Sequence, residues 1–236
     1  MALPVLNNPN YEMEIPSTGE KIEYRPFLVK EQKILMIAME SDSTSAQAKA
    51  VIDILKNCTF GKIDELIETL PTFDIEYMFI QLRAKSVGET VQLNLTCQDD
   101  GETKVPYEMF LPDIKVERTE GHDKVVMITD KVGMTFKYPT MKQLITYDFT
   151  KLDTMEGTFQ IIQDCLENVF DEEEVYDVMD KKELTKFIES LTTEQFQKVT
   201  DFFTTMPRLR HKVKVVNPNT GVESEIVLEG MQNFLG

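Results

Sequence analysis

The chain has 236 residues, of which 42% are hydrophobic and 28% charged, which is ordinary for a globular protein with its own core. Its formal net charge of −16 repels phosphate backbones and anionic lipid, so neither nucleic acid nor a membrane is an expected partner. No apolar run approaches the ~20 residues needed to span a bilayer, and the first residues lack the basic and apolar regions of a signal peptide.

The cysteines Cys58, Cys97 and Cys165 are odd in number and far apart in the chain. Such a set fits a reducing cytoplasm better than a disulfide framework. We therefore expect a cytosolic protein, or one that belongs to an assembly built in the cytosol.

Residues 1–89 are predicted to form a hairpin followed by a helical section. Apolar residues alternate on both sides of a Gly-containing turn at residues 16–20, which is typical of two short paired strands. Residues 27–40, 44–57 and 73–85 then carry apolar side chains at helical spacing and predict three main helices.

Residues 90–138 switch to a period of two and predict an antiparallel meander. Residues 139–207 return to helical spacing, with a long helix predicted up to residue 169 and two capping boxes at residues 180–183 and 192–195. Residues 208–236 predict a hairpin that returns to the sheet. The fold class is therefore α+β, a small antiparallel sheet of hairpins with two helical sections, the second inserted between sheet elements.

One tight turn occurs twice, each time between two alternating strands. Cys97 and Gly101 of the first copy lie 120 residues before Asn217 and Gly221 of the second. The glycine permits the positive φ that a tight reversal requires. Because the two hairpins share this pattern, we expect the last one to pack beside or onto the sheet that contains the first.

Both turns have the outline of a zinc-ribbon knuckle, Cys-x-x-Cys-Gly. The first keeps Cys97 but has Asp100 in place of the second cysteine, and the second has Asn217 and Thr220 in both ligand positions. One thiolate and one carboxylate cannot complete a closed tetrahedral site. The sequence therefore favours plain hairpins, or degenerate knuckles that keep the geometry without the metal, and we expect no bound metal or cofactor.

The sequence contains no motif of an active site. Phosphate-binding loops, nucleophile elbows and metalloprotease helices are missing. His122 beside Asp123 is the one candidate acid–base pair, but adjacent residues in a turn rarely face one another, and a surface turn is favoured. We expect a protein that is not an enzyme and acts by binding other proteins; the alternative is a ribbon-like regulatory protein that binds a metal or a small molecule.

Four stretches in the same order resemble the baseplate protein family of T-even-type, contractile-tailed bacteriophages. They are STGEKIEYRPFLVKEQKILMIAMES at 17–41, FDIEYMFIQLRAKSVGE at 73–89, KYPTMKQ at 137–143 and NPNTGVESEIVLEGMQNFLG at 217–236. Some members of this family carry Cys-x-x-Cys-Gly knuckles where this chain departs from that pattern.

The resemblance implies a non-enzymatic hub protein of the tail baseplate, either an assembly factor (a chaperone) or a hub subunit. Its implied partners are other baseplate hub proteins of the tail. It would be located in the host cell cytoplasm during assembly, or also in the baseplate of the virion tail.

Two segments are hypothesised to face a partner because they hold large side chains near the chain ends, where a core position is less obligatory. The hypothesis covers Tyr24, Arg25, Phe27, Met231, Phe234 and Leu235. The alternative is that these side chains close the protein's own core.

Overall fold

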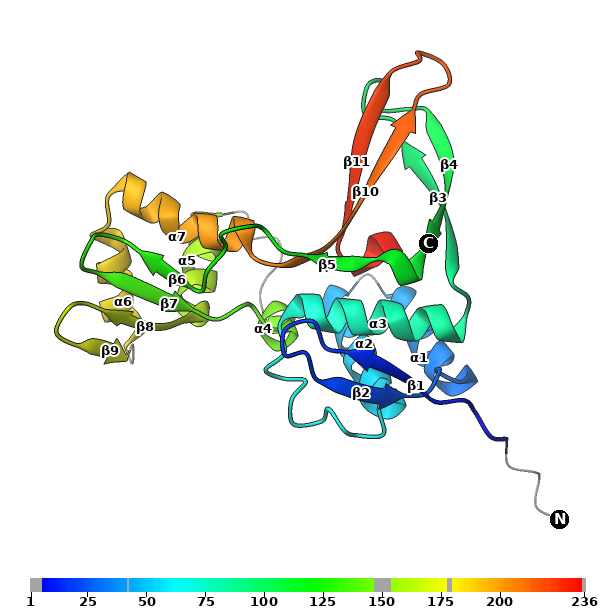
Figure 1. The fold of residues 1–236 in the computed structure, drawn as a ribbon, viewed down its shortest axis with the longest axis horizontal. Helices are drawn as coiled ribbons and strands as arrows, with labels where there is room; N and C mark the ends of the chain where they lie inside the picture. Colours follow the sequence, from blue (N-terminus) through cyan, green and yellow to red (C-terminus); the bar gives the residue numbers. More distant parts are fainter. Residues whose placement is uncertain (1–5, 42, 147–153, 178–179, 235–236) are drawn as a thin grey trace. The chain divides into compact units, whose positions relative to one another are not determined.

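The computed structural model describes residues 6–41, 43–146, 154–177 and 180–234. The chain folds into two compact units (Figure 1). Unit 1 combines Met1–Glu117 with Arg208–Gly236, and unit 2 is Arg118–Pro207. Each unit contains helices and small antiparallel sheets, so the predicted α+β class is confirmed.

This division differs from the predicted sections 1–89, 90–138, 139–207 and 208–236. The inserted unit begins at residue 118 rather than 139, and it has a sheet of its own. The strands after residue 118 pair within unit 2 and do not continue the first hairpin. A period of two identifies a strand and its buried face, but it does not identify the neighbouring strand.

The first part of unit 1 is a hairpin and three helices. These elements are β1 (Tyr11–Glu14), β2 (Lys21–Tyr24), α1 (Val29–Met39), α2 (Thr44–Cys58) and α3 (Thr72–Ser86). Asp74, which is fully buried on α3, accepts hydrogen bonds from the backbone N–H and the hydroxyl of Ser17. This carboxylate fastens the turn of the β1–β2 hairpin to the central helix.

The second part of unit 1 consists of two antiparallel sheets and two 3-10 turns. Its elements are β3 (Thr90–Thr96), β4 (Lys104–Phe110), η1 (Leu111–Asp113), β5 (Lys115–Glu117), β10 (Arg208–Val216), β11 (Glu223–Glu229) and η3 (Met231–Phe234). β3 pairs with β4, and the other sheet has the order β11–β10–β5. One core joins both sheets to α3 through Ile80, Val91, Leu209 and Phe234. The β3–β4 and β10–β11 hairpins lie side by side and both extend away from α3 (Figure 1).

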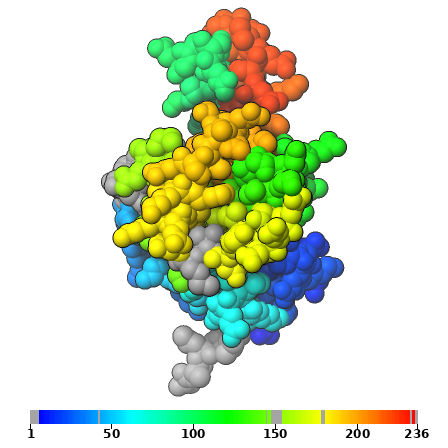
Figure 2. Space-filling view, turned by 90° about the vertical axis from the view of Figure 1, so that its left-hand side faces the viewer, coloured from blue at the N-terminus to red at the C-terminus, as the bar shows by residue number. Residues whose placement is uncertain are grey.

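Unit 2 is a four-stranded sheet with helices around it. Its elements are β6 (Val125–Met127), β7 (Gly133–Phe136), α4 (Met141–Thr146), α5 (Met155–Cys165), β8 (Leu166–Phe170), β9 (Val175–Asp177), α6 (Lys181–Glu189) and α7 (Thr193–Thr205). The order is β6–β7–β8–β9. Figure 2 shows α7, drawn in orange, at the surface of this unit.

The long helix predicted up to residue 169 ends at Cys165 instead, and the next five residues form β8. Val169 pairs with Met134 of β7 and reaches the core of unit 2. Pairing with a neighbouring strand has outweighed helical spacing, which short apolar runs do not decide by themselves. The capping box at the start of α7 is confirmed, with Thr192 and Gln195 bonding reciprocally.

Candidate functional site

The two repeated turns have the same backbone geometry. Gly101 and Gly221 have φ values of 69° and 74°, a region that favours glycine. The N–H of Gly101 donates to the carbonyl of Cys97 at 3.0 Å, and the N–H of Gly221 donates to the carbonyl of Asn217 at 2.8 Å. The sequence repeat therefore corresponds to a repeated structural turn.

The two turns also meet. Asn217, which is fully buried, donates its side-chain amide to Asp99 at 3.0 Å and to Asp100 at 2.9 Å. The hydroxyl of Thr220 donates to Asp99 as well. We call Cys97, Asp99, Asp100, Asn217 and Thr220 the knuckle junction; it joins the tips of the β3–β4 and β10–β11 hairpins, which lie side by side in Figure 1.

Hydrogen bonds within the knuckle junction stabilise the charged forms of Asp99 and Asp100. Hydrogen bonds from Thr220 and Asn217 lower the pKa of Asp99. Those from Thr103, Asn217 and the backbone likewise lower the pKa of Asp100. Both carboxylates are therefore charged and engaged at neutral pH.

The one cysteine of the junction is a protonated thiol. Burial raises the pKa of Cys97, and the neighbouring charges of Asp99 and Asp100 raise it further. Only a thiolate is a good zinc ligand. Among the described residues, no group of three or more His, Cys, Asp or Glu side chains is placed to hold a metal ion.

Three of the six residues hypothesised to face a partner lie in the core of unit 1. Tyr24, Phe27 and Phe234 are 3%, 7% and 0% exposed, so the structure places them as the alternative stated above requires. These three side chains therefore pack within unit 1 and do not project from its surface. Met231 is partly buried, and Leu235 lies outside the described residues.

Arg25 is engaged in a local ion pair. Its guanidinium lies 3.0 Å from the carboxylate of Glu31, and the two side chains are 13% and 0% exposed. Glu31 also accepts a hydrogen bond from the backbone N–H of Leu28 at the start of α1. Burial alone would raise the pKa of Glu31, but the hydrogen bonds from Arg25 and Leu28 and the charge of Arg25 outweigh burial and lower it. The pair fixes the corner between β2 and α1.

Several large apolar side chains on α1 are exposed, a feature that the sequence pattern does not predict. Only Glu31 and Ala38 of this helix are buried. Val29, Met36 and Ile37 are 80%, 57% and 58% exposed. Because residues 34–39 are apolar without interruption, helical spacing does not distinguish the inner side of this helix from the outer one.

A shallow hollow of about 400 Å³ lies along the same helix. It is lined by Phe27, Gln32, Leu35, Met36, Met39, Glu40, Arg83 and Val87. Its methionines are flexible and polarisable, and such side chains adapt to differently shaped partners. We call Val29, Met36, Ile37 and Met39, with Val87 beside them, the α1 face. Contiguous exposed apolar side chains are one of the features found at protein interaction sites.

The sequence model of the T4 bacteriophage base plate protein family matches residues 8–236. The chain therefore belongs to the T4 bacteriophage base plate protein family, as the resemblance implied. It is a phage baseplate protein, a component of the virion tail that interacts with other baseplate components.

Comparison with curated proteins and with solved structures gives no match. None of the helices in the described part of the chain combines the length and apolarity that crossing a membrane requires.

Proposed function

We propose that this protein acts in building the central hub of the baseplate, by binding other hub proteins and without catalysing a reaction. It is either a hub subunit or an assembly factor. The α1 face is the observation that carries the proposal, because it leaves several large apolar side chains in water on a protein whose family works within an assembly.

The histidines support binding rather than catalysis. His122 is held by Thr205 at 2.9 Å and by Tyr138 at 3.1 Å, and His211 is held by Tyr107 at 2.9 Å. Burial lowers the pKa of both rings. Among the described residues, neither ring is hydrogen-bonded to a carboxylate of the kind that orients a general base.

The cysteines support the same proposal. Cys58, Cys97 and Cys165 are all buried. Burial raises the pKa of Cys58 to about 11 and that of Cys165 to about 12. Because the thiolate is the nucleophilic form, these thiols are unreactive at neutral pH.

Quantitative mass spectrometry of purified phage particles, beside hub assembly intermediates from infected cells, tests the proposal. A fixed copy number in both samples identifies a hub subunit. Presence only in the intermediates identifies an assembly factor that is released once the hub is complete. Absence of the protein from both samples overturns the proposed hub role.

The same measurement on variants tests the α1 face. Met36→Gln/Ile37→Gln keeps a good helix former at each position and removes the apolar contact. We expect this variant to fold normally, and its copy number in the hub intermediates to fall at least tenfold. Lys30→Gln/Lys33→Gln, on the same helix, is the matched control and should be incorporated like the native chain. Normal incorporation of the first variant excludes this face as the contact.

A further inference from the structure

Unit 2 contains a groove of about 380 Å³ beside β8, β9 and α6. It is lined by Val132, Val169, Phe170, Asp171, Tyr176, Asp177, Asp180, Glu183, Leu184 and Phe187. Val169 and Leu184 belong to the core of the unit and are 9% and 3% exposed. The groove is therefore a place where the core is left partly open, and its volume is in the range of ligand sites.

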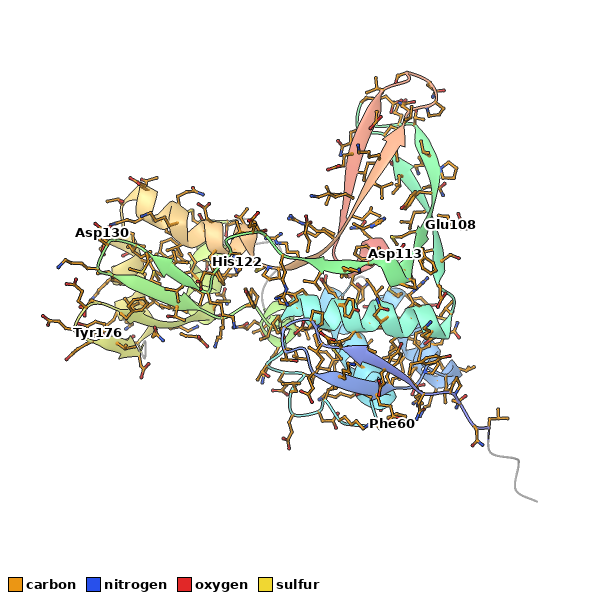
Figure 3. The ribbon with its side chains drawn as sticks, viewed as in Figure 1. Phe60, Glu108, Asp113, His122, Asp130 and Tyr176 are labelled. Carbon is orange, nitrogen blue, oxygen red and sulfur yellow. The ribbon has the colours of Figure 1, made fainter. Side chains whose placement is uncertain are left out.

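The apolar floor continues onto the outer strand of the sheet. Tyr176 lies opposite Val169 in the β8–β9 ladder, and directly opposed residues project to the same face. Tyr176 is 47% exposed. Figure 3 labels it among the side chains of β9. A large aromatic ring in this position offers a contact for an incoming apolar side chain.

Four carboxylates surround this apolar floor, and no Lys or Arg is among the described residues that line it. Asp171 accepts hydrogen bonds from the backbone of Glu173 and Glu174. Asp180 caps α6 by accepting from Lys182. Asp177 and Glu183 are exposed, and the described residues provide neither of them with a hydrogen bond or an ion pair. The local excess of negative charge is thus uncompensated within the groove.

We propose that this groove binds a segment of another protein in which basic side chains flank an apolar one. The apolar side chain contacts Val169, Leu184 and Tyr176, and the basic side chains pair with Asp177 and Glu183. Charge complementarity selects this occupant, because opposite charges steer association and suppress wrong partners. A second copy of this chain carries the same net charge of −16 and is disfavoured by repulsion.

This inference deepens the proposed function, since it gives the chemistry of a second partner contact. It concerns unit 2, whereas the α1 face belongs to unit 1. The two contacts can therefore fail independently. Peptide binding by the groove is measured in vitro and incorporation into hub intermediates is measured in infected cells, so the result of one does not predetermine that of the other.

The test is a titration of the isotopically labelled full chain with three peptides, GKLKFKG, GKSKSKG and GELEFEG, followed by NMR chemical shifts. We expect GKLKFKG to bind with shifts centred on Val169, Tyr176 and Leu184. GKSKSKG should bind at least tenfold more weakly, because it lacks apolar side chains, and GELEFEG should not bind. Affinity for GKLKFKG should fall as salt is raised, since the ion pairs are at the surface.

Charge reversal at the rim locates the contact. Asp177→Lys/Glu183→Lys should weaken GKLKFKG binding at least tenfold. Glu167→Lys/Glu194→Lys is the matched control, since Glu167 is also on a strand and Glu194 is also in the first turn of a helix; it should change affinity less than twofold. If the reversal disturbs folding, Asp177→Asn/Glu183→Gln replaces it, with an expected weakening of at least threefold.

Equal binding of GKLKFKG and GKSKSKG, or equal loss in the rim and control variants, would overturn the proposal in favour of general attraction to an acidic chain. Failure of GKLKFKG to bind at 1 mM, or binding of GELEFEG, would overturn it as well. If the groove fails while the α1 variant is lost from intermediates, the groove inference alone is wrong.

Discussion

At the scale of single residues, two buried carboxylates are expected to have a large effect on the stability of the fold. Glu31 and Asp74 are fully buried carboxylates in unit 1. Each has partners that compensate its desolvation, Arg25 for the first and Ser17 for the second. A buried charge of this kind contributes little net stability while it is paired, and it is strongly destabilising once its partner is removed.

Arg25→Met should therefore lower the free energy of unfolding by about 3 kcal/mol at pH 7, because it leaves Glu31 charged and buried. Arg25→Met/Glu31→Gln should be more stable than Arg25→Met, since the uncompensated charge is gone. Lys30 also lies 3.4 Å from Glu31 but is 68% exposed, so Lys30→Met should cost less than about 1 kcal/mol. Urea denaturation measures all three, and equal losses for the first two variants would contradict this account.

Glu76 on α3 should make the free energy of unfolding decrease as the pH rises, whereas an ordinary paired carboxylate makes it increase. Burial, with the nearby charge of Glu229, raises its pKa to about 7, against the opposing effects of a backbone hydrogen bond from Met231 and the charge of Arg208. Its pKa in the unfolded chain is about 4.3. The contribution of Glu76 to stability is therefore fully present below about pH 4.3 and is lost as the pH rises to about 7.

Glu76→Gln should remove this dependence, because the amide stays neutral and can still accept from Met231. We expect the variant to gain about 1 to 3 kcal/mol over the native chain at pH 8, and the gain to fall towards zero near pH 4. Urea denaturation at pH 4, 5, 6, 7 and 8 measures it, with the exposed Glu65→Gln as the control. A difference that is the same at every pH would show that Glu76 titrates normally.

At the scale of elements, the knuckle junction shows how hydrogen bonds between two turns connect two hairpins. In a zinc knuckle, metal–ligand bonds provide folding energy directly. Here the amide of Asn217 and the hydroxyl of Thr220 provide hydrogen bonds to Asp99 and Asp100 across the same interface. Hydrogen bonds to charged groups are stronger than those between neutral groups. The contact between the two turns therefore depends on the donors Asn217 and Thr220.

Asn217→Asp should be more destabilising than Asn217→Ala. Both remove the donated hydrogen bonds, but only the aspartate adds a third carboxylate beside Asp99 and Asp100, where like charges repel. We expect losses of about 1 to 3 kcal/mol for alanine and more for aspartate at pH 7, with the excess decreasing in high salt. Asn8→Asp, at an exposed position, controls for the added charge. If the aspartate variant is as stable as the alanine variant, a carboxylate at residue 217 is not repelled by Asp99 and Asp100, and this account of the knuckle junction is wrong.

The elements that could be predicted from the sequence are those with a single clear period. The repeated turn at Cys97–Gly101 and Asn217–Gly221 predicts both hairpins, because a tight reversal between alternating strands leaves few other structures. The meeting of their tips follows only in outline, since the offset of 120 shows similarity and gives no contact. Asp99, which accepts from both Asn217 and Thr220, occupies one of the two unspecified positions between the ligand positions of the knuckle pattern, so the pattern does not predict its role.

The remainder depends on three-dimensional packing. Tyr24 and Phe27 lie near the start of the chain, but they are 3% and 7% exposed, and the N–H of Phe27 donates a hydrogen bond to the hydroxyl of Ser86 on α3. Nearness to a chain end therefore says little about burial. On α1 the apolar residues surround the helix, and only its neighbours decide that Ala38 is inside and Met36 outside. The groove of unit 2 combines residues of β8, β9 and α6, and no single segment contains its pattern.

At the scale of the whole molecule, unit 2 is an insertion between two strands that pair with each other. The chain leaves unit 1 after Glu117 and returns at Arg208, and these two residues are direct partners in the β5–β10 ladder. Directly opposed residues of antiparallel strands lie about 5 Å apart. The entry and exit of the insertion are therefore adjacent, and a loop of a few residues can close the gap.

Replacement of residues 118–207 by Gly-Asn-Gly-Ser should leave unit 1 folded. Its core of Ile80, Val91, Leu209 and Phe234 lies entirely within unit 1, and loop-closure entropy is lower for the short loop than for the 90-residue unit it replaces. We expect a cooperative unfolding transition and the knuckle junction intact, with the pKa of Asp99 still below its usual range by NMR.

The matched control has the same replacement together with Leu209→Ala, which removes a fully buried side chain and should cost about 2 to 5 kcal/mol. If the shortened chain is unfolded without that substitution, then unit 1 depends on unit 2, and the two units are one folding unit. If it folds, unit 2 has been added to a self-sufficient fold, and the groove can be deleted from the protein without disturbing the α1 face. Each of the two proposed contacts could then be tested in its own unit.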